Sequence, residues 1–386
     1  MRHPSQRLPS FLAVPANALG IALTALLLLL PALTAAQGAI AVGRTLPITG
    51  PIAVYGNAKR LGGDAYIERV NREGGVRGRR IALTTLDDKY DAAEAVKNIR
   101  TFDDAGVVAI LNLLGVPIVA AALPVMEQLK LPAVGLTSGA AAARNPHRRY
   151  GFPVRASYAD EATAITRHFK SLNLTRVIIV RQNNPFGNSV ADNMLAALEA
   201  AGIKPVADFV VKVDGSDTKE AVAKLAAAEA VNVVFLAMQA PVAIPMIDAL
   251  RTGAVQSGAN LFSISAIDTT QLAAALKEKA RGVAISQIVP LAQTALPLVR
   301  EYIRDLKAIN GGVPSYYGLE AYVEAKILVE GLRRSTIIGR EALVTALESL
   351  GAYDLGGMLV NYGPGRHEGS RFVDLTMVSR EGSLVR

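Results

Sequence analysis

Residues 176–181 read Arg-Val-Ile-Ile-Val-Arg, and this stretch decides the fold. Four β-branched residues in a row are typical of a strand that is covered on both faces, because a half-exposed strand alternates apolar with polar side chains. Residues 231–236, Val-Asn-Val-Val-Phe-Leu, follow the same pattern. Strands of this kind belong to parallel sheets that carry helices on both sides.

The rest of the chain alternates similar short runs with amphipathic helical patterns. The strands expected by this criterion are 40–46, 80–86, 107–111, 133–135, 176–181, 205–211, 231–237, 261–265 and 282–287. Helices are expected between them and again at 297–310 and 317–334, where apolar residues recur on one face. This repeated alternation predicts an α/β fold with parallel sheets and right-handed crossovers.

One sheet does not easily hold that many strands, so we expect two doubly wound parallel-sheet lobes joined by a multi-strand hinge. The segment 150–158, Tyr-Gly-Phe-Pro-Val-Arg-Ala-Ser-Tyr, interrupts the alternation and suits a strand that crosses between lobes. We therefore assign residues 37–155 plus 286–358 to the first lobe. The second lobe is assigned residues 156–285 plus 359–386.

The N-terminus has the pattern of a secretory signal peptide. Arg2 and Arg7 precede an apolar run at 18–33, and the small residues Thr34 and Ala36 follow it. We place cleavage after Ala36. A single membrane anchor is the alternative, but no basic cluster follows the run. The mature chain is expected to be soluble and exported to the periplasm.

Composition excludes several classes of protein. The chain has no cysteine, so lipid attachment at a cleavage-site cysteine, disulfides and cysteine metal sites are all excluded. Loss of residues 1–36 removes Arg2 and Arg7 and no acidic residue, so the net charge falls from +8 to +6. The remaining basic residues are scattered among acidic ones, which favours a solvated surface over nucleic-acid binding.

Several short segments have a characteristic order and spacing along the chain. They are 46–56 (Leu-Pro-Ile-Thr-Gly-Pro-Ile-Ala-Val-Tyr-Gly), 71–81, 87–88, 131–134, 137–139, 144–146, 154–161, 184–187 and 201–202. Together they give the chain a resemblance to the type 1 periplasmic binding proteins of the branched-chain (leucine, isoleucine, valine) amino-acid transport family. It implies a solute-binding component of an ABC importer, which captures a branched-chain or related amino acid by hinge closure. It also implies an inner-membrane permease as partner, a monomer, no cofactor and no metal.

In doubly wound sheets, ligands bind at loops beyond the carboxyl ends of the strands. In the loop 49–57, the resemblance implies that Tyr55 contacts the ligand; the alternative is that Tyr55 packs on its own lobe. The next loop contains Leu114, Gly115 and Val116. Family members carry a hydroxyl residue where Val116 aligns, so a carboxylate would rely there on backbone N–H groups.

Residues from other loops complete the expected site. Ser138 aligns with a hydroxyl on the ligand carboxylate, and Thr137 with a residue whose backbone carbonyl meets the ammonium. Phe186 aligns with an aromatic that closes over the ligand. The alternatives are a turn that caps the next helix for residues 137–138 and core packing for Phe186. Gln239 is positioned to bond a polar ligand.

The family's acidic partner for the ligand ammonium is missing. Its position aligns with Ser265 or Ala266, and the nearest carboxylate is Asp268. Asp268 would either take over this role or cap a helix. A receptor for an aromatic or other organic acid is therefore an alternative to an amino-acid receptor, as is a ligand sensor that regulates a membrane partner.

An enzyme is not expected. No nucleophile elbow, P-loop or Gly-x-Gly-x-x-Gly turn is present, and an exported hydrolase or lyase would need a nucleophile–base pair. His147 and His168 have no acidic or histidine partner at metal-binding spacing, so both are interpreted as surface residues. The glycine-rich segment 363–369, which contains His367, is interpreted as a loop.

Overall fold

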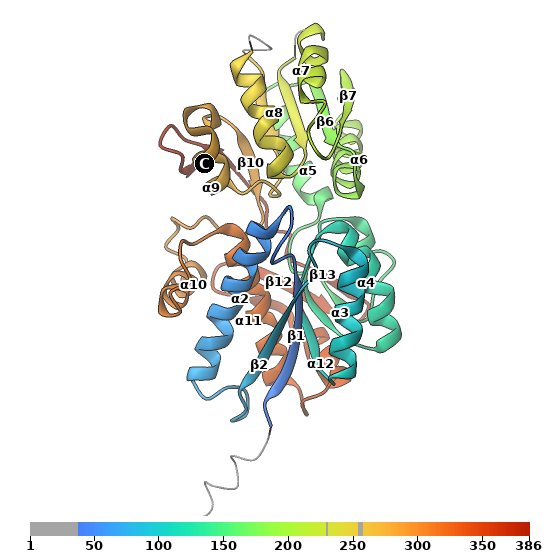
Figure 1. Cartoon of the computed structure of the whole chain (residues 1–386), viewed down its shortest axis with the longest axis vertical. Helices are drawn as coiled ribbons and strands as arrows, with labels where there is room; N and C mark the ends of the chain where they lie inside the picture. Colours follow the sequence, from blue (N-terminus) through green and yellow to red (C-terminus); the bar gives the residue numbers. More distant parts are fainter. Residues whose placement is uncertain (1–37, 229–230, 254–257) are drawn as a thin grey trace, which may run out of the picture.

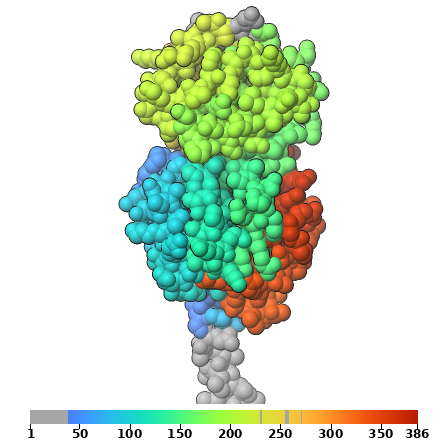
Figure 2. Space-filling view, turned by 90° about the vertical axis from the view of Figure 1, so that its right-hand side faces the viewer, coloured from blue at the N-terminus to red at the C-terminus, as the bar shows by residue number. Residues whose placement is uncertain are grey.

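The computed structural model describes residues 38–228, 231–253 and 258–386, and the predicted signal peptide lies outside these ranges. The chain forms two lobes stacked along the long axis of the molecule (Figure 1). Figure 2 shows the two lobes in contact at their facing ends. In the described part of the chain, no helix is both long and apolar enough to cross a membrane.

The first lobe contains a parallel sheet with the strand order β2-β1-β3-β4-β5. Its strands are β1 (Ile40–Leu46), β2 (Ile81–Asp87), β3 (Ala109–Leu114), β4 (Ala133–Thr137) and β5 (Gly151–Phe152). Its helices are α2 (Ala53–Arg72), α3 (Ala92–Asp104), α4 (Val116–Leu129), α10 (Pro297–Ala308), α11 (Tyr316–Arg334) and α12 (Arg340–Glu348). The last three come from the C-terminal third of the chain, so the lobe is built from two separate segments.

Helices α2 and α11 pack very closely at two glycines. A Cβ atom on Gly62 would lie 1.9 Å from the carbonyl oxygen of Gly318, so only glycine fits there. This contact positions the first turns of α11 beside α2. These first turns carry Tyr317 and Glu320, which contact Tyr55 and Lys59 of α2 respectively.

The second lobe contains a sheet with the order β15-β14-β10-β9-β8-β6-β7. Its strands are β6 (Val177–Gln182), β7 (Ala207–Val211), β8 (Val233–Ala237), β9 (Asn260–Ser263), β10 (Ala284–Gln287), β14 (Asp374–Val378) and β15 (Leu384–Val385). Its helices are α5 (Tyr158–Ser171), α6 (Pro185–Ala200), α7 (Thr218–Ala227), α8 (Ala240–Thr252) and α9 (Thr269–Leu276). β14 and β15 pair antiparallel, whereas β6 to β10 pair in parallel.

The predicted α/β class with two parallel sheets is confirmed. Residues 177–180 are fully buried, as expected for a strand covered on both faces. The structure moves several strand ends by one to three residues relative to the expected ranges. The largest difference is at the end of β3, which extends three residues beyond the expected range.

The chain crosses between lobes after β5, after β10 and after β13 (Figure 1). The expected boundary at 358/359 is wrong, because β11 (Gly351–Asp354), β12 (Leu359–Gly363) and β13 (Arg366–Gly369) form one antiparallel sheet. Val360 and Tyr362 of β12 are buried in the core of the first lobe. The last segment of the second lobe therefore begins at β14. The expected boundary at 285/286 falls inside β10 and is also displaced.

Candidate functional site

The first five strands of each lobe have the same order in their sheet. In both lobes the second strand pairs on one side of the first strand and the third strand pairs on its other side, which creates a switch point between the first and third strands. In the first lobe this point lies between β1 and β3, and in the second lobe between β6 and β8. Ligands of open α/β sheets bind at such switch points, beyond the carboxyl ends of the strands. The loops that follow these four strands face one another across the inter-lobe contact.

Hydrogen bonds join the two switch points directly. The backbone N–H of Ala240, at the start of α8, donates to the hydroxyl of Tyr55 at 3.2 Å. The amide nitrogen of Gln239 lies 3.5 Å from the hydroxyl of Tyr90. Tyr55 also stacks on Tyr317, with ring centroids 4.5 Å apart. Burial raises the pKa of Tyr55, so its hydroxyl stays neutral. Tyr55 therefore lies between the lobes, where the resemblance implies that the ligand binds.

The loop from β3 to α4 places a helix N-terminus at the same interface. Gly115 has a φ of +108°, and a Cβ atom there would lie 2.3 Å from the ring of Tyr90. No described side chain caps α4 at Gly115. Leu114 and Val116 are buried among residues of the second lobe, including Tyr158 and Phe186 in the case of Val116. The first turn of α4 thus directs N–H groups without intrahelical partners toward the second lobe.

The residues after β4 form a compact turn. Ser138 is buried, and its hydroxyl accepts a hydrogen bond from the N–H of Ala140 at 3.2 Å. Its carbonyl oxygen accepts from Arg144 at 2.9 Å. Thr137 donates from its hydroxyl to Glu324 Oε1 at 3.2 Å. The turn expected as the alternative role of residues 137–138 is therefore present, but it does not cap the next helix (Ala141–Ala143), which has no side-chain cap hydrogen bond.

The second lobe contributes aromatic and amide groups. Phe186 is buried and packs edge-on against Tyr158, with ring centroids 5.9 Å apart. The backbone N–H of Gln239 donates to the Gln182 side chain at 2.8 Å, and the Gln182 amide donates back to Gln239 Oε1 at 3.3 Å. This pair holds the Gln239 side chain at the end of β8, facing Tyr90 of the first lobe.

An arginine from the first crossing segment occupies the region around Ser265. Arg155 is 3% exposed and pairs with Glu161 at 3.0 Å, and it also donates to the Ser265 hydroxyl. Glu161 accepts from the backbone N–H of Ser265 at 3.0 Å and from the Ser286 hydroxyl at 2.6 Å. The carboxylate of Glu161 is thus compensated by a cation and by neutral donors.

A second buried ion cluster extends the first into the first lobe. Lys59 is fully buried between Glu320 at 3.4 Å and Glu324 at 2.9 Å, and Arg155 lies 3.8 Å from Glu320. Burial raises the pKa of Glu324 to about 7, although the neighbouring Lys59 acts in the opposite direction. Three acidic and two basic groups, all almost excluded from water, therefore connect α2, α11, the first crossing segment and α5.

Asp268 lies at the margin of this arrangement. Its carboxylate accepts from the N–H of Gln271 at 3.0 Å, so it caps α9, as the alternative prediction stated. It also lines a cavity of about 490 Å³ between the lobes, together with Asn57, Leu61 and Tyr302. The cavity is within the usual size range of small-molecule sites.

The sequence analysis did not single out several residues of the interface. Tyr90 contributes the hydroxyl that lies near Gln239, and Arg155 and Glu161 form the central ion pair. A charged residue within the apolar crossing segment 152–156 was a signal for Arg155, because a buried arginine needs a partner. Tyr90, like Tyr55, follows a strand by a few residues. The periodicity of the sequence does not indicate that Tyr90 lies at the interface.

Comparisons with known proteins agree with this geometry. The family described as "Periplasmic binding protein" matches residues 39–383. A Leu/Ile/Val-binding protein homologue of Brucella melitensis is 28% identical over 202 residues, which is 51% of this chain and 53% of that protein. The matched region thus spans about half the length of that curated relative.

Two solved structures cover nearly the whole described chain. One, from Rhodopirellula baltica, is described as a possible leucine/isoleucine/valine-binding protein; it has a TM-score of 0.84 at 25% identity and covers 91% of this chain and 96% of its own. The other is a substrate-binding periplasmic protein from Ralstonia solanacearum, with a TM-score of 0.82, 28% identity and coverage of 90% and 99%. From the fold, the facing switch points and these matches, the chain belongs to the family of periplasmic binding proteins, with the two-lobed type 1 fold.

Proposed function

We propose that this protein is the periplasmic solute-binding component of an ABC importer, exported by its N-terminal signal peptide. It captures a small carboxylate-bearing ligand between the lobes and presents it to an inner-membrane permease. The names of the relatives favour leucine, isoleucine and valine as the first ligands to test.

The observation that carries this proposal is the start of α4 at the buried inter-lobe contact. A helix N-terminus offers free N–H groups and a partial positive charge, both of which stabilise a carboxylate. The residues Gly115 and Val116 place these groups opposite the aromatic pair Tyr158 and Phe186 of the second lobe. Ser138 lies on the neighbouring strand end and would add a hydroxyl donor once its side chain turns toward the ligand.

Hinge closure follows from how the lobes are connected. The three crossing segments would allow the lobes to move as rigid bodies, and contacts between the facing ends of the lobes hold them closed. They include the Ala240–Tyr55 and Gln239–Tyr90 hydrogen bonds and the apolar contact of Val116. A ligand that bridges the two switch points would add to these contacts and shift the population toward the closed form.

A second ligand class is favoured by the environment of Ser265. The family places an acid there to neutralise a ligand ammonium, but Ser265 contacts the guanidinium of Arg155, and Glu161 is already paired with the same cation. An ammonium at this point would meet a guanidinium and a carboxylate that is already paired with it, in place of the family's acid. A carboxylic acid without an amine, aliphatic or aromatic, needs no such acid and is therefore the competing ligand.

Thermal unfolding of the protein without residues 1–36, against amino acids and amine-free organic acids, tests the proposal. A ligand at one hundred times its dissociation constant adds about 2.7 kcal/mol to the free energy of unfolding, which raises the midpoint. A shift with leucine, isoleucine or valine supports the amino-acid receptor, and a shift with amine-free acids alone supports the competing ligand. No shift with any compound of either class would overturn the proposal.

The variant Ser138→Ala locates the site once a ligand is found. We expect it to weaken binding about 10- to 150-fold, because a hydrogen bond to a charged group contributes about 1.5–3 kcal/mol. Ser171→Ala is the matched control: Ser171 is exposed at the end of α5, and its hydroxyl bonds only the carbonyl oxygen of His168 among the described residues. Equal affinity in both variants would remove Ser138 from the site.

A further inference from the structure

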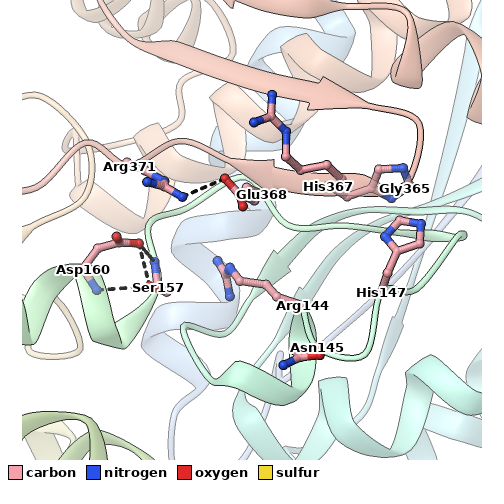
Figure 3. A pocket seen from close by; sticks show the side chains of 10 residues that line it. Arg144, Asn145, His147, Ser157, Asp160, Gly365, His367, Glu368 and Arg371 are labelled. Atoms are coloured by element: carbon pink, nitrogen blue, oxygen red, sulfur yellow. Dashed lines mark hydrogen bonds and ion pairs between the residues drawn. The ribbon is translucent and has the colours of Figure 1, made fainter. Parts of the chain in front are cut away.

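Three side chains that are distant in sequence converge on one side of the first lobe. His147 lies in the loop before β5, Glu348 is the last residue of α12, and His367 lies on β13. One potential ligand atom of each lies within 4.8 Å of those of the other two. Figure 3 shows the rings of His147 and His367 facing each other. The sequence analysis interpreted 363–369 as a loop, which is wrong for 366–369, because these residues form a strand that carries His367 to His147. The interpretation of His147 as a surface residue is confirmed, since its side chain is exposed.

The hydrogen bonds of His367 fix the direction of its free electron pair. Its Nδ1 lies 2.9 Å from the carbonyl oxygen of Gly151, which can only accept, so Nδ1 carries the hydrogen. In the neutral ring, Nε2 then bears a lone pair, and it lies 3.3 Å from Glu348 Oε1. A positive charge between or beside these two atoms would satisfy both of them, either as a proton, which gives an imidazolium–carboxylate pair, or as a metal ion. A backbone carbonyl on the other ring nitrogen is also the usual support of a metal-bound histidine.

The distances match a small divalent ion. In a tetrahedral zinc site with bonds of about 2.0–2.2 Å, neighbouring ligand atoms lie roughly 3.3–3.6 Å apart. The Nε2–Oε1 distance of 3.3 Å fits one edge of this tetrahedron. His147 is exposed, with its ring centroid 4.5 Å from that of His367, so it can adjust as the third ligand. Two imidazoles and one carboxylate suit zinc and exclude magnesium and calcium, which prefer all-oxygen sites.

We propose that His147, Glu348 and His367 form a zinc site with a fourth position open to solvent. A cavity of about 290 Å³ borders both histidines and gives access to it. Arg144, Arg366 and Arg371 also line this cavity. Of these, Arg371 is paired with Glu368 at 3.0 Å, and Arg144 donates to two backbone carbonyls. The proposal is independent of the inter-lobe ligand.

The site would act as a clip at the base of the hinge. β13 leads directly into the last crossing, where the N–H of Ser370 donates to the carbonyl oxygen of Val154 in the first crossing at 2.8 Å. Bound zinc would join the loop before β5, the end of α12 and β13. The loop before β5 leads into the first crossing, and β13 leads into the last one. The metal would therefore stiffen the first-lobe side of the hinge.

The test is a zinc titration of the protein without residues 1–36, free of any affinity tag and stripped with a chelator. We expect one equivalent of Zn²⁺ to bind. His147→Ala and Glu348→Gln should each weaken binding at least about tenfold, since loss of even an outer partner of a metal ligand costs 10–100-fold. Co²⁺ in place of Zn²⁺ should give the intense visible absorption of a tetrahedral ion, which both variants lose.

His168→Ala is the control, because His168 lies on α5 in the second lobe, away from the cluster. It should bind zinc like the unchanged protein. His147 is exposed, so His147→Ala should keep the thermal midpoint measured in chelator, and this variant decides the matter if Glu348→Gln does not fold. The proposal is overturned by the absence of stoichiometric zinc binding, by equal binding in His147→Ala, or by equal loss in His168→Ala.

Discussion

The substitution Gly115→Ala should destabilise the protein and weaken ligand binding together. Gly115 has a φ of +108°, a conformation that costs a residue with a Cβ atom on the order of 1–3 kcal/mol. The new methyl group would also lie 2.3 Å from the ring of Tyr90. Overpacking of this kind costs roughly 1–3 kcal/mol more, so the expected total loss is about 2–6 kcal/mol.

Gly74→Ala separates the two contributions. Gly74 has a similar φ of +100°, but no atom lies within 4 Å of the position that its Cβ would take. The stability loss in Gly74→Ala therefore comes only from the unfavourable backbone conformation. Urea unfolding of both variants should show Gly115→Ala less stable by about 1–3 kcal/mol, the overpacking cost.

Ligand titration should show weaker binding in Gly115→Ala alone, because the displaced Tyr90 ring and the α4 N-terminus lie at the inter-lobe contact. Equal stability and equal affinity in the two variants would refute the close contact of Gly115 with Tyr90.

Two further changes examine closure and buried charge. Tyr55→Phe keeps the stacking on Tyr317 but leaves the buried N–H of Ala240 without its acceptor. This should destabilise the closed form by about 1–3 kcal/mol, which corresponds to a roughly 5–150-fold loss of ligand affinity. Ligand titration checks this, with Tyr353→Phe, a half-buried tyrosine of β11, as control, and an unchanged affinity would contradict the inter-lobe role of Tyr55. Burial raises the pKa of Glu324 from 4.5 to about 7, so between these pH values the folded protein keeps a proton that the unfolded chain has lost. The contribution of Glu324 to stability is therefore complete below about pH 4.5 and declines as the pH rises to about 7. Urea unfolding at several pH values should show this decline in the difference between the unchanged protein and Glu324→Gln, and a difference that grows with pH would have the wrong sign.

The periodicity of the sequence determined the layers of the fold. Runs such as 177–180 could only be strands covered on both faces, and the helical stripes between them required parallel sheets. These features depend on neighbouring residues, so they can be read locally. The boundary between lobes could not be read in this way, because β12 is assigned to the first lobe by its pairing with β11 and by the burial of Val360 and Tyr362.

The loops of the site were also predictable, since parallel strands end at one edge of the sheet and Tyr55, Gly115 and Ser138 follow such ends. What these side chains contact was decided by tertiary structure alone. Arg155 meets Ser265 across 110 residues, and Ala240 meets Tyr55 across 185. His147 and His367 come together because β13, more than 200 residues after β5, returns to the side of β5. The sequence by itself determined the two α/β lobes and the strand-end loops, because these follow from local periodicity; the charge pairs, the closing contacts and the histidine cluster depend on long-range packing, which no local pattern encodes.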